Sequence, residues 1–188
     1  MRFKYWSSMV LCLASPALYA HSGEMSDNGF LSGLLHPLTG ADHLLVLIAV
    51  GICAAKQGGK AIILFPGIFL ALMSAGALMR SYAVHIPFIE LLITVSVMVF
   101  GLLASVNQKQ LSGLFFSATA FFAVFHGYAH AAEIPQGAPV ISYFSALLLM
   151  SLMICMSGIL LGLSTGKRAN YLFSLTCLSS GLYFLAAG

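Results

Sequence analysis

Two short segments of this apolar chain each combine two histidines with one or more acidic residues. Imidazole nitrogens and carboxylate oxygens are together the ligands with which proteins hold Zn²⁺, Ni²⁺, Co²⁺ or Fe²⁺. These residue types therefore predict a site for a divalent transition metal ion. The six candidate ligands are His36, Asp42, His43, His126, His130 and Glu133.

In the first segment, helical spacing places two of the three candidates on one face. His36 and His43 are seven residues apart, which is two turns of an α-helix. Asp42 would lie about 100° away from His43 on an ideal helix. Pro37 and Gly40 stand between these residues, and proline removes one backbone hydrogen bond and clashes with the preceding turn. We therefore expect a kink from Pro37 to Gly40 that turns Asp42 toward the histidines.

In the second segment, all three candidates share a face without any distortion. His126, His130 and Glu133 stand at positions i, i+4 and i+7 of a predicted helix. Two histidines four residues apart can hold one ion, because their rings extend over the same groove. Thr119 continues this stripe further along the helix. The second segment thus predicts a metal-binding face on a regular helix.

The composition indicates that these segments lie in a membrane. Hydrophobic residues make up 60% of the 188 residues, charged residues only 7%, and the mean hydropathy is +0.99. Soluble domains carry about 25% charged residues, so the surface of this chain must face a lipid bilayer. The net charge of +3 is small and the basic residues are scattered, which argues against a nucleic-acid partner. Ionisable groups are costly in lipid, so the clustered ones indicate function.

The first 20 residues have the pattern of a secretory signal peptide. Arg2 and Lys4 form a basic start, residues 8–18 are apolar, and Ala20 offers a small residue for cleavage. The apolar stretch is shorter than the about 20 residues that a spanning helix needs. We predict a cleaved leader over residues 1–20, with an uncleaved first helix as the alternative.

Six longer apolar runs follow the leader. In lipid, backbone polar groups must be bonded within their own segment, so each run should be an α-helix. The connections are short, and residues 21–188 are predicted to form a single domain. The predicted fold class is an all-α membrane protein with six transmembrane helices after a cleaved signal peptide. The runs are 30–55, 60–79, 86–105, 111–132, 140–163 and 169–187.

The basic residues predict the orientation of these helices. After cleavage of the leader, the mature N-terminus lies outside, and six spans return the C-terminus to the same side. The connections after the first, third and fifth runs then face the cytoplasm, and they carry most of the basic residues, as the positive-inside rule requires. The outer connections carry only Arg80. We predict a multi-pass protein of the bacterial inner membrane with both termini periplasmic. The cytoplasmic basic residues are Lys56, Lys60, Lys109, Lys167 and Arg168.

Two features of the runs bear on packing. Small residues recur four apart, and such spacing lets membrane helices approach closely. Tyrosines near the ends of the runs are expected to anchor the chain at the membrane interface. The spaced small residues are Gly67, Ala71 and Ala75 in the second run and Gly158 and Gly162 in the fifth.

Two further residues extend the candidate metal ligands. Glu90, near the outer end of the third run, would lie at the same depth as the two segments. Cleavage after Ala20 would leave His21 as the first residue, and its imidazole and free α-amine could chelate an ion. A solvated tail is the alternative interpretation of His21.

The two histidine segments resemble the signatures of the HupE/UreJ family of nickel and cobalt permeases. The first signature resembles His-Pro-x-x-Gly-x-Asp-His and is matched in full, by His36, Pro37, Gly40, Asp42 and His43. The second resembles Phe-His-Gly-x-Ala-His-Gly-x-Glu. Its matches are Phe125, His126, Gly127, Ala129, His130 and Glu133. Ala131 replaces the second glycine of that signature, which removes no ligand.

This resemblance implies a permease that takes up Ni²⁺, with Co²⁺ as a second candidate, to supply nickel enzymes such as hydrogenase or urease. No cofactor would be bound permanently, and a homo-oligomer is left open. The chain has no nucleotide-binding motif, so transport would be facilitated or secondary. The alternative from the residues alone is an intramembrane zinc-dependent hydrolase with Glu133 as base.

Overall fold

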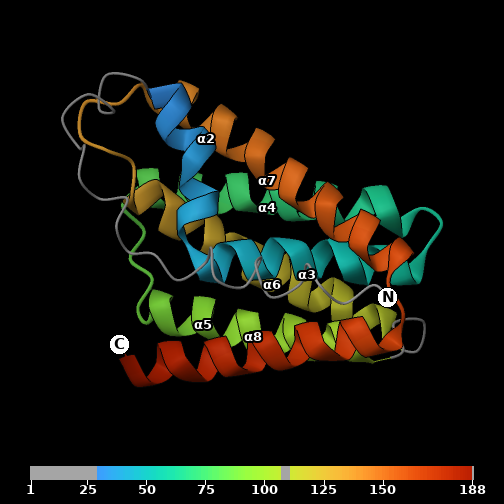
Figure 1. Ribbon diagram of the computed structural model, residues 1–188. Helices are drawn as coiled ribbons and strands as arrows, with labels where there is room; N and C mark the ends of the chain where they lie inside the picture. Colours follow the sequence, from blue (N-terminus) through green and yellow to red (C-terminus); the bar gives the residue numbers. More distant parts are fainter. Residues whose placement is uncertain (1–28, 107–110, 188) are drawn as a thin grey trace.

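The computed structural model describes residues 29–106 and 111–187, and these residues form helices without any strand (Figure 1). The prediction of an all-α protein is therefore confirmed, and the helix bounds lie within three residues of the predicted apolar runs. The predicted leader over residues 1–20 and His21 lie outside the described residues. The helices are α2 (Gly29–Thr39), α3 (Ala41–Gln57), α4 (Ala61–Ser81), α5 (Ile89–Ser105), α6 (Ser112–Ala132), α7 (Val140–Ser164) and α8 (Lys167–Ala187).

Three of the described helices are long and apolar enough to cross a membrane by themselves, namely α4, α6 and α7. The pair formed by α2 and α3 also qualifies when it is counted as one bent span, which gives up to four. The α5 helix is apolar but has only 17 residues, and α8 is the least hydrophobic of the described helices and does not qualify. The chain is a helical membrane protein; its six-span arrangement stays a prediction.

The predicted kink in the first run is present and lies at Gly40. The α2 and α3 helices are bent by 78° at this break. Pro37 stays inside α2, and Gly40 adopts an extended conformation with φ −89° and ψ 110°. The Thr39 hydroxyl donates a hydrogen bond to the His36 carbonyl oxygen at 2.8 Å and so satisfies a carbonyl group near the broken end. The break makes Asp42 and His43 the first turn of α3.

Close helix contacts are made at glycines that face a neighbouring backbone. A Cβ atom at Gly127 of α6 would collide with the Met73 carbonyl oxygen of α4, and one at Gly76 would collide with that of Val124. Gly158 of α7 meets α3 in the same way. The prediction was therefore right for the fifth run, where Gly162 also packs on α3.

The predicted small-residue stripe of the second run was wrong. A Cβ atom at Gly67 would meet nothing within 4 Å, and Ala71 is exposed. The buried face of α4 instead carries Phe65, Phe69 and Met73 ahead of Gly76 and Ala77. Small residues four apart occur on any face of an apolar helix, and only the neighbouring helix decides which face is used.

The ends of the bundle separate the connections into two sets (Figure 1). The α4–α5 and α6–α7 connections lie at one end, together with the start of α2. The α3–α4 and α7–α8 connections lie at the opposite end. Lys56, Lys60, Lys167 and Arg168 belong to the α3–α4 end, whereas Arg80 belongs to the α6–α7 end. The charge asymmetry predicted from the sequence is thus present in the fold.

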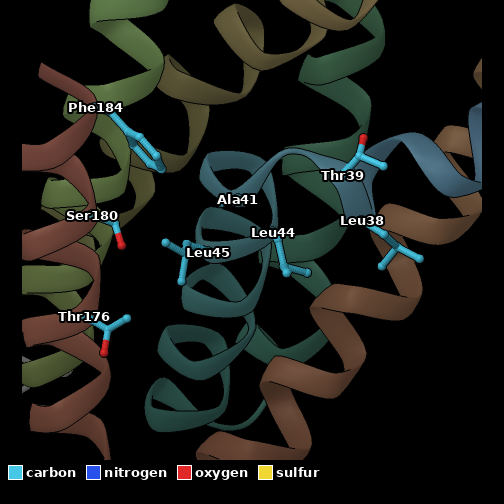
Figure 2. Close-up of a pocket in the computed structure, with 8 residues that line it drawn as sticks. All are labelled: Leu38, Thr39, Ala41, Leu44, Leu45, Thr176, Ser180 and Phe184. Atoms are coloured by element: carbon cyan, nitrogen blue, oxygen red, sulfur yellow. The ribbon is translucent and has the colours of Figure 1, made fainter. Parts of the chain in front are cut away.

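A groove of about 280 Å³ lies beside the bend, between α8 and the α2–α3 pair (Figure 2). Its walls are mostly apolar, and none of the histidines or carboxylates of the two segments lines it. The lining residues are Leu38, Thr39, Ala41, Leu44, Leu45, Thr176, Ser180 and Phe184. The groove is therefore not formed by the candidate ligands, although residues between His36 and Asp42 line it.

Candidate metal site

Four imidazole rings from the two segments form a continuous row, which we call the histidine row. His36 of α2 lies 5.0 Å from His130 of α6, measured between ring centroids. His130 lies 4.1 Å from His43 of α3, and His43 lies 4.8 Å from His126 of α6. The rings thus alternate between the bent pair and α6. The fold brings together all four histidines that the two signatures contain.

Three residues at the α6–α7 end of the row form what we call the three-ligand cluster. The Nε2 atom of His36 lies 3.0 Å from Oε2 of Glu133, and Nδ1 of His130 lies 3.9 Å from the same oxygen. One ligand atom of each of the three residues falls within 4.8 Å of the others. The His36 side chain is 23% exposed and that of Glu133 is 47% exposed, whereas that of His130 is only 1% exposed. The cluster is open on one side and buried on the other.

Asp42 contacts the neighbouring ring of His43. Its Oδ1 atom accepts a hydrogen bond from the His43 backbone N–H at 2.7 Å and lies 2.8 Å from Nδ1 of the same residue. An ionised carboxylate only accepts hydrogen bonds, so Nδ1 of His43 carries the ring hydrogen. The Nε2 atom then holds a lone pair that a metal ion can use, an arrangement common for metal-binding histidines.

The hydrogen bonds of Ser96 in α5 indicate which ring nitrogen of His126 carries the hydrogen. Its hydroxyl donates a hydrogen bond to the Ile93 carbonyl oxygen at 2.6 Å and lies 2.9 Å from Nε2 of His126. A hydroxyl has one proton, so Nε2 of His126 donates in the second bond. The Nδ1 atom of His126 is then left with a lone pair for an ion.

Two ring nitrogens in the row have no hydrogen-bond partner among the residues that the structure describes. They are Nε2 of His43 and Nδ1 of His130, in side chains that are 8% and 1% exposed. Buried polar atoms in proteins are nearly always hydrogen-bonded. Two unpartnered imidazole nitrogens in adjacent rings are therefore what an ion-binding row would present.

Glu90 and His21 are not brought into the row by what the structure describes. Glu90 lies in the first turn of α5 and is exposed. It is outside the three-ligand cluster. Its role as a ligand stays a prediction, and so does that of His21.

Sequence reasoning missed the supporting residues on other helices. Ser96 was one of several polar residues in an apolar run, and its partner on another helix could not be known from the sequence. Tyr128 and Tyr143 were expected to be interface anchors, yet both are buried. The Tyr128 hydroxyl accepts hydrogen bonds from Arg80 at 3.2 Å and from the Ile86 backbone N–H at 3.4 Å. It thereby ties the α4–α5 connection to the helix that carries His126 and His130.

The chain is similar to known proteins over most of its length. The chain matches the family described as HupE / UreJ protein over residues 9–187. It is 31% identical over 172 residues to protein HupE of Rhizobium leguminosarum bv. viciae, a match that covers 90% of each chain. No solved structure matches the chain significantly.

Proteins of this family transport nickel or cobalt ions and are not enzymes. The alternative of a zinc-dependent hydrolase is therefore not supported. The histidine row and its carboxylates consist of residues from the two signature segments, His36 to His43 and His126 to Glu133. The chain belongs to the HupE / UreJ family of metal-ion transporters.

Proposed function

We propose that this protein takes up Ni²⁺, with Co²⁺ as a second substrate, along the histidine row. The observation that carries the proposal is the continuity of that row. It leads from the half-exposed Glu133 through consecutive ring contacts to the fully buried His126. Glu133 directly follows α6 and stands seven positions after His126, which corresponds to about 10 Å along the helix axis. An ion can move this far through steps between neighbouring ligands.

The three-ligand cluster is the proposed point of capture. It offers two imidazole nitrogens and one carboxylate oxygen within 4.8 Å, and it is partly open to solvent. Mixed nitrogen and oxygen ligands suit Ni²⁺ and Co²⁺, which stand next to each other in the order of metal affinities. The carboxylate offsets part of the ion's charge when water is removed from the ion.

His130 is the proposed point of transfer. Its ring contacts His36 on one side and His43 on the other, so it belongs both to the capture cluster and to the buried part of the row. Asp42 and Ser96 would act through His43 and His126, by keeping one ring nitrogen of each unprotonated. Each step must bind the ion weakly enough to release it.

The predicted leader and the six predicted spans support a direction for this transport. With the leader cleaved and six spans, the α6–α7 end would face the periplasm and the α3–α4 end the cytoplasm. The half-exposed cluster then faces the side from which the ion enters. Ni²⁺ delivered to the cytoplasm would supply the maturation of nickel enzymes. Glu90 and His21 would add carboxylate and imidazole groups at the periplasmic mouth.

The proposal is tested by metal uptake into liposomes that contain the purified protein. Ni²⁺, Co²⁺, Zn²⁺ and Mn²⁺ are offered side by side, with protein-free liposomes as the control. We expect saturable entry of Ni²⁺, weaker entry of Co²⁺, and little entry of Mn²⁺, which prefers oxygen ligands. Entry of Ni²⁺ at the protein-free rate would overturn the proposal.

A further inference from the structure

A buried phenol lies beside the three-ligand cluster, on a helix that neither signature includes. Tyr143 is in the first turn of α7, and its side chain is 0% exposed. Its ring centroid lies 5.8 Å from that of His36. Tyr143 is thus a direct neighbour of one residue of the cluster, His36.

The position of Tyr143 is determined by backbone packing. A Cβ atom at Gly33 of α2 would collide with the Tyr143 carbonyl oxygen, so the two helices approach as closely as glycine permits. His36 follows Gly33 by about one turn. Gly29, one turn before Gly33, packs closely on Pro139, where the nearest atom is the proline Cδ. The α2–α7 contact therefore holds the phenol at a set distance from the His36 ring.

The hydroxyl of Tyr143 has no hydrogen-bond partner among the described parts of the chain. Removing a buried hydroxyl from water without giving it a partner costs free energy. The hydroxyl can both donate and accept. An unpartnered hydroxyl on a buried ring beside His36 is explained if its partner arrives with the ion.

The ion would bring that partner. The three-ligand cluster offers three ligand atoms, whereas Ni²⁺ bound to nitrogen and oxygen ligands takes four or more. Water molecules would fill the remaining positions at a capture point where dehydration has only begun. A water molecule held in a buried site needs hydrogen-bond partners of its own.

We propose that Tyr143 is a positioning residue of the capture site, whose hydroxyl forms a hydrogen bond with a water molecule that the bound ion retains. This inference rests on the proposed function, because it assumes that the three-ligand cluster captures the ion. It assigns a polar role to α7, which otherwise contributes packing at this end. The hydroxyl acts through water and does not replace any of the three ligands.

The test is Tyr143→Phe, which removes only the hydroxyl. Ni²⁺ binding to the purified protein is measured by calorimetry, and uptake is measured in liposomes. We expect the dissociation constant and the KM for Ni²⁺ to rise about tenfold, with the maximal uptake rate within about twofold. The melting temperature of the metal-free protein should be equal or higher, because an unpartnered buried hydroxyl is lost. Tyr171→Phe, at a 58% exposed tyrosine of α8, is the matched control and should behave as wild type.

The outcomes separate this inference from the proposed function. If wild type binds and transports Ni²⁺ and Tyr143→Phe does so with unchanged affinity, the role of Tyr143 is wrong and the proposed function stands. If wild type neither binds nor transports Ni²⁺, both are wrong. A lower melting temperature of metal-free Tyr143→Phe, with Ni²⁺ affinity unchanged relative to wild type, would show that the hydroxyl serves folding alone.

Discussion

The buried face of α6 changes character along its length. Toward the α6–α7 end it carries His126 and His130, which belong to the histidine row. Toward the α3–α4 end it carries Phe115 and Phe122, which pack with aromatic rings of α4 and α5. The same helix therefore faces polar rings in one half of the bundle and apolar rings in the other.

The apolar half forms what we call the phenylalanine cluster, made of Phe65, Phe100, Phe115 and Phe122. Ring centroids are 4.4 Å apart for Phe65 and Phe115, 6.1 Å for Phe100 and Phe115, and 6.0 Å for Phe100 and Phe122. All four side chains are at most 7% exposed. Aromatic rings at these separations pack favourably and exclude water. The cluster is a dry core.

The two halves meet at His126. Phe69 of α4 lies 5.7 Å from its ring. Two helical turns away, toward the α3–α4 end of α6, the hydroxyl of Thr119 is buried without a partner among the described residues. On the proposed path, an ion at His126 would face this apolar core. Onward passage would then require the phenylalanine side chains to move.

The largest expected effect on Ni²⁺ uptake comes from His130→Ala. This variant removes the ring that contacts both His36 of the three-ligand cluster and His43. We expect initial Ni²⁺ uptake in liposomes to fall by more than about 100-fold, beyond the 10- to 100-fold effects of residues behind a ligand. His85→Ala, at an exposed histidine in the α4–α5 connection, is the control. Equal uptake by both variants would contradict the assigned row.

A second large effect is expected from Gly127→Ala, because the added methyl group would push α6 away from α4. The added Cβ atom would collide with the Met73 carbonyl oxygen, and overpacking of this kind costs about 1–3 kcal/mol. We expect a lower melting temperature and weaker Ni²⁺ binding, because His126 and His130 flank the contact. Gly67→Ala meets open space and should change neither quantity. The same loss in both variants would argue against the α4–α6 contact.

A smaller effect is expected from Ser96→Ala, which leaves the ring of His126 in place but frees its ring hydrogen. Loss of a hydrogen-bond partner behind a metal ligand lowers metal affinity about 10- to 100-fold. We expect the lower end of this range by calorimetry, because three other imidazoles remain. Ser96→Thr keeps the hydroxyl and should restore affinity. If the threonine variant is as weak as the alanine variant, the hydroxyl is not the cause.

The smallest effect on ion binding is expected from Phe115→Ala in the phenylalanine cluster. Removing a buried phenylalanine side chain costs about 3–5 kcal/mol of stability, so the melting temperature should fall. Ni²⁺ affinity should stay within about twofold of wild type, because the histidine row lies in the other half. A tenfold loss of affinity would mean that the phenylalanine cluster belongs to the binding site, and the comparison would fail.

Much of the fold was predictable because helix formation in an apolar chain is local. The bounds of the described helices follow the apolar runs, and the periodicity of 3.6 residues placed His126, His130 and Glu133 on one face. The bend was predictable from Pro37 and Gly40, although only the structure placed it at Gly40. The packing face of α4 was not predictable, because it depends on which helix lies beside it.

The sequence by itself determined the types and the order of the candidate ligands, and the face that His126 and His130 share on α6. It also determined the family, through two short signatures that need no structure to be recognised. The tertiary structure alone decided that α6 lies against the bent pair, so that four rings alternate in one row. Only the tertiary structure shows that Asp42 forms a hydrogen bond with the His43 ring. It also shows that Ser96 of α5 contacts His126 and that Tyr143 of α7 contacts His36. The physical reason is the distance along the chain over which each effect acts. Helical periodicity depends on residues a few positions apart. Contacts between helices join residues far apart in the chain and depend on how two helix faces fit together.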